Sequence, residues 1–242
     1  MPIELWLGSE FDHGHEVEAL QRFLRSLCSA YADDPSLYLV LANFRVSDSP
    51  IDLAVLSPHG LCVVELKEAT GALLVRENGP WLSKTSTGEE RAIKAGRFAN
   101  PFDQIKHYRY DLIRFMDANK GRFLLERHGD PPALDHIGAF VAVSPTLPAG
   151  SDLRPPKLKW FRLVGLDELH LAIGTVRSPR LRFDVREMRD LTSQLLGLTQ
   201  VPLTRFVPEP HREPSSPRPA RRCSPGPPPR CCCARSFASS SA

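Results

Sequence analysis

The sequence has no long apolar run. A membrane-spanning helix needs about 18 residues that are mostly apolar, whereas the apolar segments here are strand-sized, such as "LYLVLANFRV" at 37–46. The amino terminus, "MPIELWLGSEFDHGHE", also lacks a basic start followed by an apolar block, which a secretory signal requires. These absences predict a cytoplasmic protein that does not enter a membrane.

Cysteine is scarce outside the last part of the chain. Cys28 and Cys62 stand singly in apolar runs, as cysteines that fill a core do, and the other four are Cys223 and Cys231 to Cys233. Three adjacent cysteines do not have the spacing of a zinc site, and a disulfide framework needs another context. We therefore expect reduced thiols.

Residues 1–206 also lack an excess of basic charge. The segment 207–242 has six Arg, no Lys and two Glu, so the +3 of the whole chain leaves residues 1–206 at −1. The sequence pI of 8.6 therefore comes from that last segment. Net charge is thus no argument that the rest of the chain binds nucleic acid.

The segment 207–242 differs from the rest in composition as well. It holds nine of the 23 prolines, many serines and few residues that form a core. Such a segment buries too little apolar surface to offset the entropy of ordering. We predict a folded domain at 1–206 and a disordered basic tail at 207–242, whose arginines either bind nucleic acid loosely or serve as a spacer.

Apolar periodicity within 1–206 predicts an α/β domain without internal repeats. Polar, irregular sequence fills 79–99, and Asp167 is a candidate cap for a short helix. Asn100 and Pro101 are a typical cap and first residue of a helix. Helices are predicted at 15–31, 100–117 and 185–198, and strands at 37–46, 72–78, 136–144 and 159–165.

The segment 51–71, "IDLAVLSPHGLCVVELKEATG", predicts two apolar strands joined by a Pro-His-Gly turn. With the turn centred on the Pro-His pair, Asp52 falls opposite Glu65. Opposed residues of an antiparallel pair have Cβ atoms roughly 4.5–5.5 Å apart. Lys67 is two residues from Glu65 and points to the same face. Three charged side chains are therefore expected together at one end of an apolar hairpin.

Two carboxylates this close repel each other strongly away from water. Either one holds a proton or a cation lies between them. Mg²⁺ prefers oxygen ligands and keeps several waters, and it activates water and polarises a phosphoryl oxygen. Lys67 would orient that water or offset charge on the phosphate. Asp52, Glu65 and Lys67 thus suit phosphodiester hydrolysis with Mg²⁺ or Mn²⁺; the alternative is an exposed salt bridge on a half-open sheet.

Asp52 followed after a hairpin by "ELK" at 65–67 resembles the active-site signature of the PD-(D/E)XK nuclease superfamily. More narrowly, "IDLAVLSPHGLCVVELKEATGALL", Trp81 and "NPFDQIKHY" resemble the nuclease-related domain family, NERD. The resemblance runs from about His13 to Tyr110 and extends less closely to Ser144. It implies a restriction-endonuclease-like fold, in which a central mixed β-sheet is flanked by helices.

The resemblance also implies roles for the charged residues. Asp52 and Glu65 would be metal ligands, and Lys67 the catalytic base or stabiliser. The proline that usually precedes the aspartate is absent. A glutamate on the helix before the first strand often joins such a site; Glu16 matches it best and Glu18 is the alternative, although the positive end of a helix would by itself explain Glu16.

Gln104 and Tyr108 resemble the Gln-x-x-x-Tyr pair that related RecB-type nucleases carry on the helix after the core strands. Four residues apart, they share one helix face, so both can reach one site. Tyr108 also lies on the apolar stripe of that helix, where a core role explains it equally well. Gln104 is polar near the core face and needs a partner.

Two other groups of residues are candidates for binding. His13 and His15 in "HGHE" are either metal ligands or parts of a surface turn. Four cations in the polar stretch either contact a phosphate backbone or are ordinary charges of a solvated loop; they are Lys84, Arg91, Lys94 and Arg97.

Two functions follow from these observations. The first is a Mg²⁺-dependent nuclease that acts on DNA, in DNA processing or phage defence. The second is a non-catalytic or regulatory module that binds nucleic acid or protein, since NERD-like domains are similar to ones joined to helicase or serine/threonine kinase regions. The sequence itself has neither a glycine-rich phosphate loop nor a kinase signature, so a kinase or helicase would be a partner.

Overall fold

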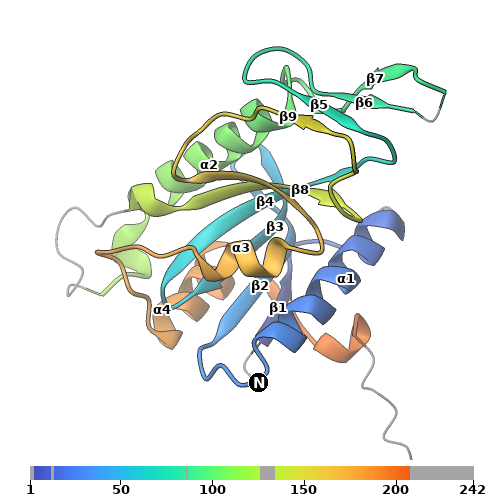
Figure 1. The fold of residues 1–242 in the computed structure, drawn as a ribbon. Helices are drawn as coiled ribbons and strands as arrows, with labels where there is room; N and C mark the ends of the chain where they lie inside the picture. Colours follow the sequence, from blue (N-terminus) through green and yellow to red (C-terminus); the bar gives the residue numbers. More distant parts are fainter. Residues whose placement is uncertain (1–2, 12–13, 86, 126–133, 208–242) are drawn as a thin grey trace, which may run out of the picture. The chain divides into compact units, whose positions relative to one another are not determined.

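The computed structural model of the chain describes residues 3–11, 14–85, 87–125 and 134–207. Its centre is a seven-stranded sheet in the order β10-β8-β4-β3-β2-β1-β11. The pairs β1–β2, β4–β8 and β8–β10 are parallel and the other three are antiparallel. This mixed sheet confirms the predicted α/β class (Figure 1). Its strands are β1 (Ile3–Leu7), β2 (Tyr38–Val46), β3 (Ser49–Ser57), β4 (Gly60–Glu68), β8 (Gly138–Ser144), β10 (Phe161–Gly165) and β11 (Thr199–Val201).

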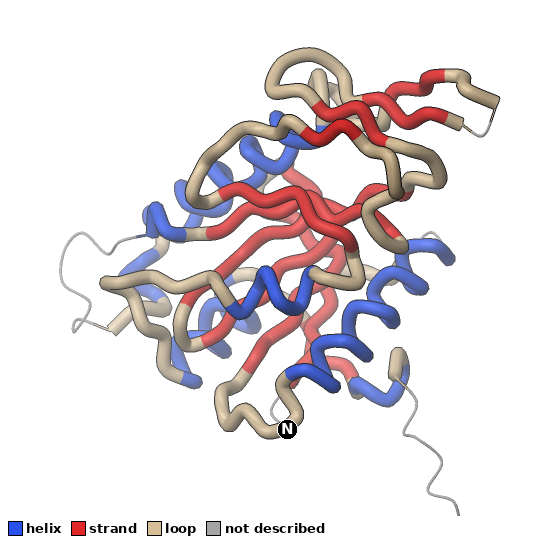
Figure 2. The backbone as a smooth tube through the Cα atoms, viewed as in Figure 1, coloured by secondary structure: helices blue, strands red, loops and turns tan. Residues whose placement is uncertain are grey.

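Helices cover both faces of the sheet (Figure 2). On one face, α1 and α3 bury apolar side chains such as Phe23 and Ile173. On the other, α2 and α4 bury Ile105 and Met188 among others. Because both faces are covered, the central strands are continuously apolar rather than alternating. The helices are α1 (Gly14–Ala30), α2 (Pro101–Ala118), α3 (Leu169–Gly174) and α4 (Val185–Arg189), with a π-helix at Asp190–Leu195 and 3-10 turns at Lys120–Arg122, Leu134–His136 and Leu203–Arg205.

A second, four-stranded sheet corrects the prediction that residues 79–99 are irregular. Its order is β7-β6-β5-β9, and two of its strands form a hairpin inside that stretch. Trp81 anchors the hairpin: its side chain is buried and its Nε1–H donates to the carbonyl oxygen of Arg76 at 2.9 Å. All of β7 is exposed and β6 is at most half-buried, so their sequence lacks the apolar alternation that predicts a strand. The strands are β5 (Leu73–Val75), β6 (Leu82–Lys84), β7 (Glu90–Ala92) and β9 (Asp152–Leu153).

The predicted helices and strands are present, but the strands predicted at 72–78 and 159–165 shorten to Leu73–Val75 and Phe161–Gly165, and β1 and β11 were not predicted. Two further differences concern helices. The last predicted helix begins at Val185, as expected, but changes to a π-helix at Asp190. The short helix α3 is preceded by Glu168 rather than capped by Asp167. In the described ranges, no helix combines the length and apolarity that crossing a membrane requires. The predicted tail at 207–242 lies outside the described residues, apart from Val207.

Helix α2 begins where the sequence predicts, because Asn100 is held on two sides. Its Oδ1 accepts a hydrogen bond from the backbone N–H of Asp103 at 2.9 Å, which satisfies one of the free donors of the first turn. Its Nδ2 donates to the carbonyl oxygen of Gly79 at 2.9 Å. Asn100 is fully buried, so it joins the start of α2 to the loop before Trp81.

Replacing Asn100 with Ala is expected to lower the free energy of unfolding by about 1–3 kcal/mol, because a cap is lost and a carbonyl is left without its partner. Urea unfolding followed by circular dichroism measures the change. Asn100→Ser keeps a neutral capping oxygen but cannot reach Gly79, so it should fall between Ala and the wild type. Equal stability of all three proteins would contradict the assignment.

Candidate active site

Backbone pairing of β3 with β4 runs from the turn as far as Leu53 and Val64, in the predicted register. One step further, the same register brings Asp52 level with Glu65. The ladder does not continue there: Oδ2 of Asp52 accepts a hydrogen bond from the backbone N–H of Leu66 at 2.9 Å. The two strands therefore separate where the acids lie, and the Asp52 side chain holds them together.

The separation of β3 from β4 at Asp52 coincides with an irregularity that β3 shares with β2. Ile51 packs on the α2 face and Leu53 on the α1 face, although residues two apart in a regular strand share a face. The same switch occurs in β2 across Asn43, which lies opposite Asp52. Asn43 has a φ of 49°, a left-handed conformation that Asn tolerates better than most residues. At this irregularity the Asp52 carboxylate points toward β4, where it accepts the hydrogen bond from Leu66.

Glu65 and Lys67 lie on one face of β4, as the alternation of a strand predicts. The Nζ of Lys67 is 2.6 Å from Oε1 of Glu65. Glu65 is only 3% exposed, and its second oxygen, Oε2, is buried without a hydrogen-bond partner among the described residues. A buried carboxylate oxygen without a partner is costly, so this atom marks a place where a proton, a cation or water belongs.

Gln104 and Tyr108 of α2 face the same group. The Nε2 of Gln104 donates to the Tyr108 hydroxyl at 3.0 Å, and both side chains are buried. The Gln104 amide lies close enough to Glu65 to lower the pKa of that carboxyl. In the described structure the Gln104 Oε1 is also buried without a partner. Two unpartnered oxygens, on β4 and on α2, are thus present in one buried region.

Electrostatics in this region favour an added positive charge. Burial, and then the charge of Asp52, raise the pKa of Glu65 to about 8, against the opposing effect of Lys67. Burial likewise raises the pKa of Asp52, and Glu16 adds to this, while the Leu66 N–H and Lys67 lower it. The Lys67 ammonium lowers both pKa values but does not outweigh burial. An added proton or cation would therefore relieve the cost of the buried negative charge.

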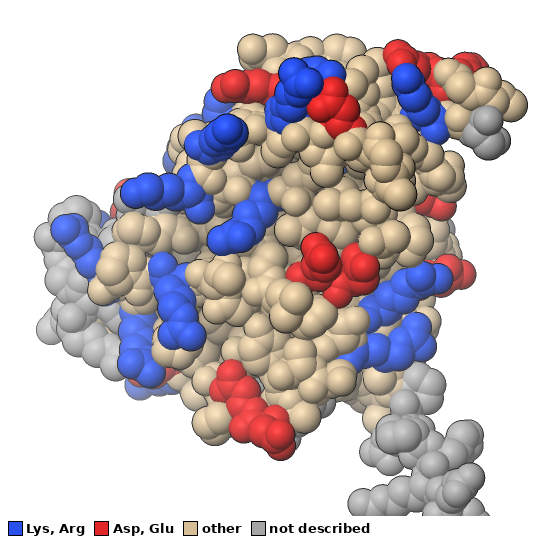
Figure 3. Space-filling view, viewed as in Figure 1, with Lys and Arg blue, Asp and Glu red and all other residues tan. Residues whose placement is uncertain are grey.

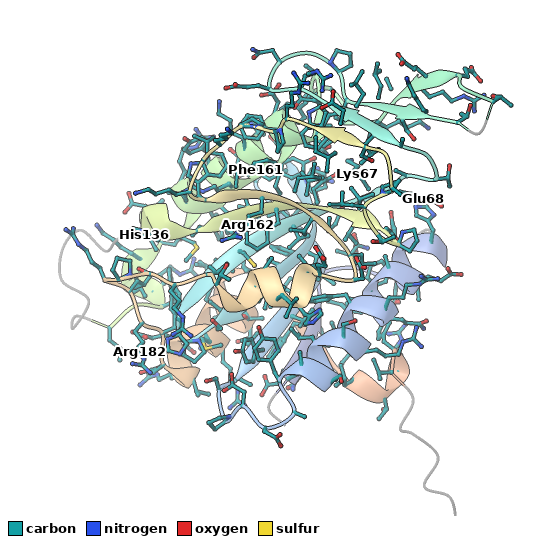
Figure 4. All side chains as sticks on the ribbon, viewed as in Figure 1. Lys67, Glu68, His136, Phe161, Arg162 and Arg182 are labelled. Carbon is teal, nitrogen blue, oxygen red and sulfur yellow. The ribbon has the colours of Figure 1, made fainter. Side chains whose placement is uncertain are left out.

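Asp52 borders a cavity of about 190 Å³ between α1 and the ends of β4 and β8. Glu16, Glu18 and Lys67 line it as well. The charge of Glu16 raises the pKa of Asp52, and the site role of Glu16 stays a prediction. Figure 4 shows Lys67 at the end of β4, where this cavity lies.

A family model described as nuclease-related domain, NERD, matches residues 13–141. The chain belongs to the NERD family. The match covers more than half of the chain and includes all six predicted site residues, from Glu16 on α1 to Tyr108 on α2. No match was found among curated proteins or among solved structures.

Asp52 and Glu65 of this NERD domain offer carboxylate oxygens, the type of ligand that a hard divalent ion such as Mg²⁺ prefers. In the described ranges, no group of three or more His, Cys, Asp or Glu side chains is arranged to hold a metal. Mg²⁺ keeps several of its waters, however, and is bound through one or two carboxylates. Asp52 and Glu65 supply such oxygens, and among the described residues Oε2 of Glu65 has no hydrogen-bond partner at normal distance. The two acids would hold the ion, with Glu16 nearby.

The remaining sequence candidates in the NERD domain separate into different places. His13 lies outside the described residues, whereas His15 lines the cavity beside Asp52. Arg91 and Lys94 line a cavity of about 590 Å³ that Lys67 also lines.

Two of the four cations lie elsewhere. Lys84 pairs with Glu90 across the β6–β7 hairpin, with its Nζ 3.5 Å from Oε1. Arg97 contacts His107, with its Nη2 3.2 Å from Nε2, and lines a separate cavity. Of this stretch, Arg91 and Lys94 line the cavity beside Lys67, whereas Arg97 is close enough to Tyr108 for its charge to oppose burial, which raises the pKa of that hydroxyl.

Two residues of this region were missed. Arg22 lines the Asp52 cavity one helical turn after Glu18, and its place on the polar face of α1 was the available signal. Asn43, opposite Asp52 on the neighbouring strand, is the irregular position that accompanies the orientation of Asp52. The available signal was an asparagine in the middle of an apolar strand, where this residue is disfavoured.

Proposed function

We propose that this NERD domain is a metal-dependent nuclease that hydrolyses phosphodiester bonds in DNA. The support comes from Glu65, whose Oε2 is buried without a hydrogen-bond partner among the described residues. Its other oxygen, Oε1, is 2.6 Å from Nζ of Lys67, and the strand register brings the residue level with Asp52. Acidic oxygens that lack compensation, beside a fixed ammonium, suit a site that binds a cation and then a phosphate.

Each side chain has a distinct part in the proposed reaction. Asp52, positioned by the Leu66 N–H, and Glu65 would hold Mg²⁺ or Mn²⁺. When bound, the ion would supply Lewis-acid activation of water and of a phosphoryl oxygen. Lys67 Nζ would orient the attacking water or stabilise negative charge on the phosphate.

The helix residues would act on these groups indirectly. Gln104, which lies beside Glu65, and Tyr108, which receives its hydrogen bond, would fix the carboxylate from the α2 side. Glu16 would add negative charge near Asp52 and so favour the ion. These three are positioning residues in the proposal.

The cavity between β4 and the β6–β7 hairpin gives DNA a route to Lys67. Arg91 and Lys94 on its wall are suited to contact phosphates, which position a nucleic acid without reading its sequence. The Arg91 guanidinium is 2.9 Å from Oε2 of Glu89, but both side chains are exposed and such pairs are weak, so a phosphate can replace the carboxylate.

The test is cleavage of supercoiled plasmid and linear DNA by the purified chain. Activity is expected with Mg²⁺ or Mn²⁺, absent with EDTA, and restored when Mg²⁺ is added in excess. Cleavage that persists in EDTA would contradict the proposal. Binding of DNA without cleavage under every metal condition would favour the non-catalytic module instead.

A further inference from the structure

A second cavity, of about 350 Å³, lies at the amino ends of β8 and β10, beside the segment that follows α3. Gly138 in its wall pairs with Cys62, whereas Lys67, five residues along β4, pairs with Val143. At about 3.3 Å per residue, these two positions are roughly 17 Å apart along the strands. Figure 4 likewise shows Arg162 well away from Lys67. The cavity is therefore separate from the candidate active site.

Three basic side chains line this cavity: Lys159 and Arg162 from the β10 segment and Arg177 after α3. His136, before β8, lines it as well, and no described Asp or Glu does. Lys159, Arg162 and Arg177 are exposed, and none forms an ion pair within the described ranges. Like charges gathered in this way repel one another and destabilise the fold. An anion bound between them would remove that cost.

Arg177 also acts on the turn between β3 and β4. Burial first, and then the charges of Arg177 and Arg182, lower the pKa of His59 in that turn, while Asp34 opposes them. The backbone N–H of Ser178 donates to the carbonyl oxygen of His59 at 2.8 Å, so the segment after α3 is fixed to the turn. Figure 3 shows Lys and Arg side chains as a band along this side of the molecule.

The wall of the cavity is rigid. Trp160 stacks on Phe102 with ring centres 6.0 Å apart, and the guanidinium of Arg109 lies 4.6 Å from the Trp160 ring centre. Arg109 is buried, and its Nε donates to the carbonyl oxygen of Ile137 at 2.6 Å. These contacts fix the backbone that carries Lys159 and Arg162, so a ligand that binds there orders only their exposed side chains.

We propose that this cavity binds a phosphate of a nucleic-acid strand, through Lys159, Arg162 and Arg177, outside the active site. Guanidinium groups match phosphate oxygens in pairs. Because the Trp160 ring already has aromatic and cationic contacts, the cavity offers charge rather than base stacking, and binding should not depend on base sequence. The band of cations suits a polymer better than a free nucleotide.

This inference rests on the proposed function for its ligand, DNA, but it involves residues outside the candidate active site. Lys159, Arg162 and Arg177 all lie beyond the segment 13–141 that matches the NERD family. The binding would thus belong to the part of the sheet that follows the family segment, and it would hold DNA at a distance from the cleaved bond.

The experiment measures binding of the full chain to a fluorescein-labelled DNA duplex by anisotropy, in EDTA, at several salt concentrations. Arg162→Ala/Arg177→Ala is expected to raise Kd about tenfold and to reduce the slope of log K against log salt by about 1–2. Arg25→Ala/Arg45→Ala removes the same charge from other exposed positions and should change Kd by less than about twofold, since its arginines line neither cavity.

Competition with unlabelled duplex and with ATP separates the two sources of phosphate. Unlabelled duplex is expected to displace the labelled duplex. ATP at the same concentration of phosphate groups is not expected to displace it. The inference would be overturned if the two double variants changed Kd for the duplex equally. It would also be overturned if Arg162→Ala/Arg177→Ala lost binding of ATP and kept binding of the duplex. Lack of cleavage by the wild type in Mg²⁺ would count against the proposed function alone, because this binding is measured without metal.

Discussion

Lys67→Met is expected to lower the rate of DNA cleavage by about 10²–10³-fold while DNA binding changes little, because the ammonium acts on charge that develops during the reaction. Methionine keeps most of the length and apolar volume of the lysine stem. In the wild type, Nζ is 2.6 Å from Oε1 of Glu65 and the side chain is 14% exposed, so solvent cannot easily substitute for it. Single-turnover cleavage and anisotropy on the same duplex measure the two quantities separately.

Lys157→Met is the matched control for this variant. Lys157 is exposed and lines none of the described cavities around Asp52 or Lys67, so cleavage should be unchanged. If Lys67→Met cleaves DNA at the wild-type rate, then the reaction does not use this site. If it loses binding as strongly as cleavage, Lys67 contributes to affinity rather than to the chemical step.

The features that the sequence predicted well depend on short-range rules. The register of the β3–β4 hairpin follows from a two-residue turn, and it determines which residues are level with Asp52. The start of α2 follows from Asn100 and Pro101. In both cases the deciding residues lie within a few positions of the feature, where sequence patterns are informative.

The features that were missed depend on residues far apart in the chain. Asp52 turns toward Leu66 because β2 is irregular at Asn43, and no pattern within β3 reveals this. The second sheet joins Leu74 to Asp152, and its hairpin is too exposed for an apolar alternation. The basic cavity forms only because β8 and β10 lie in parallel next to the segment after α3.

The contribution of Glu65 to the free energy of unfolding is expected to fall as the pH rises from about 4.5 to about 8. Burial, followed by the negative charge of Asp52, raises the pKa of this carboxyl to about 8 in the folded protein. In the unfolded chain it loses its proton near its ordinary pKa, so the folded state binds one proton more throughout this interval. Stability then decreases with pH, by at most about 1.4 kcal/mol per pH unit for one proton.

Glu65→Gln is expected to flatten this dependence, because the amide keeps the shape of the side chain and does not ionise. Urea unfolding at a series of pH values, with EDTA present so that no divalent ion replaces the proton, gives the slope for each protein. Glu77→Gln alters an exposed carboxyl and should run parallel to the wild type. If Glu65→Gln also runs parallel to it, Glu65 does not hold an extra proton in the folded state. The carboxyl would then be ionised in the folded state and still able to bind a cation, so only the argument from its raised pKa would be lost.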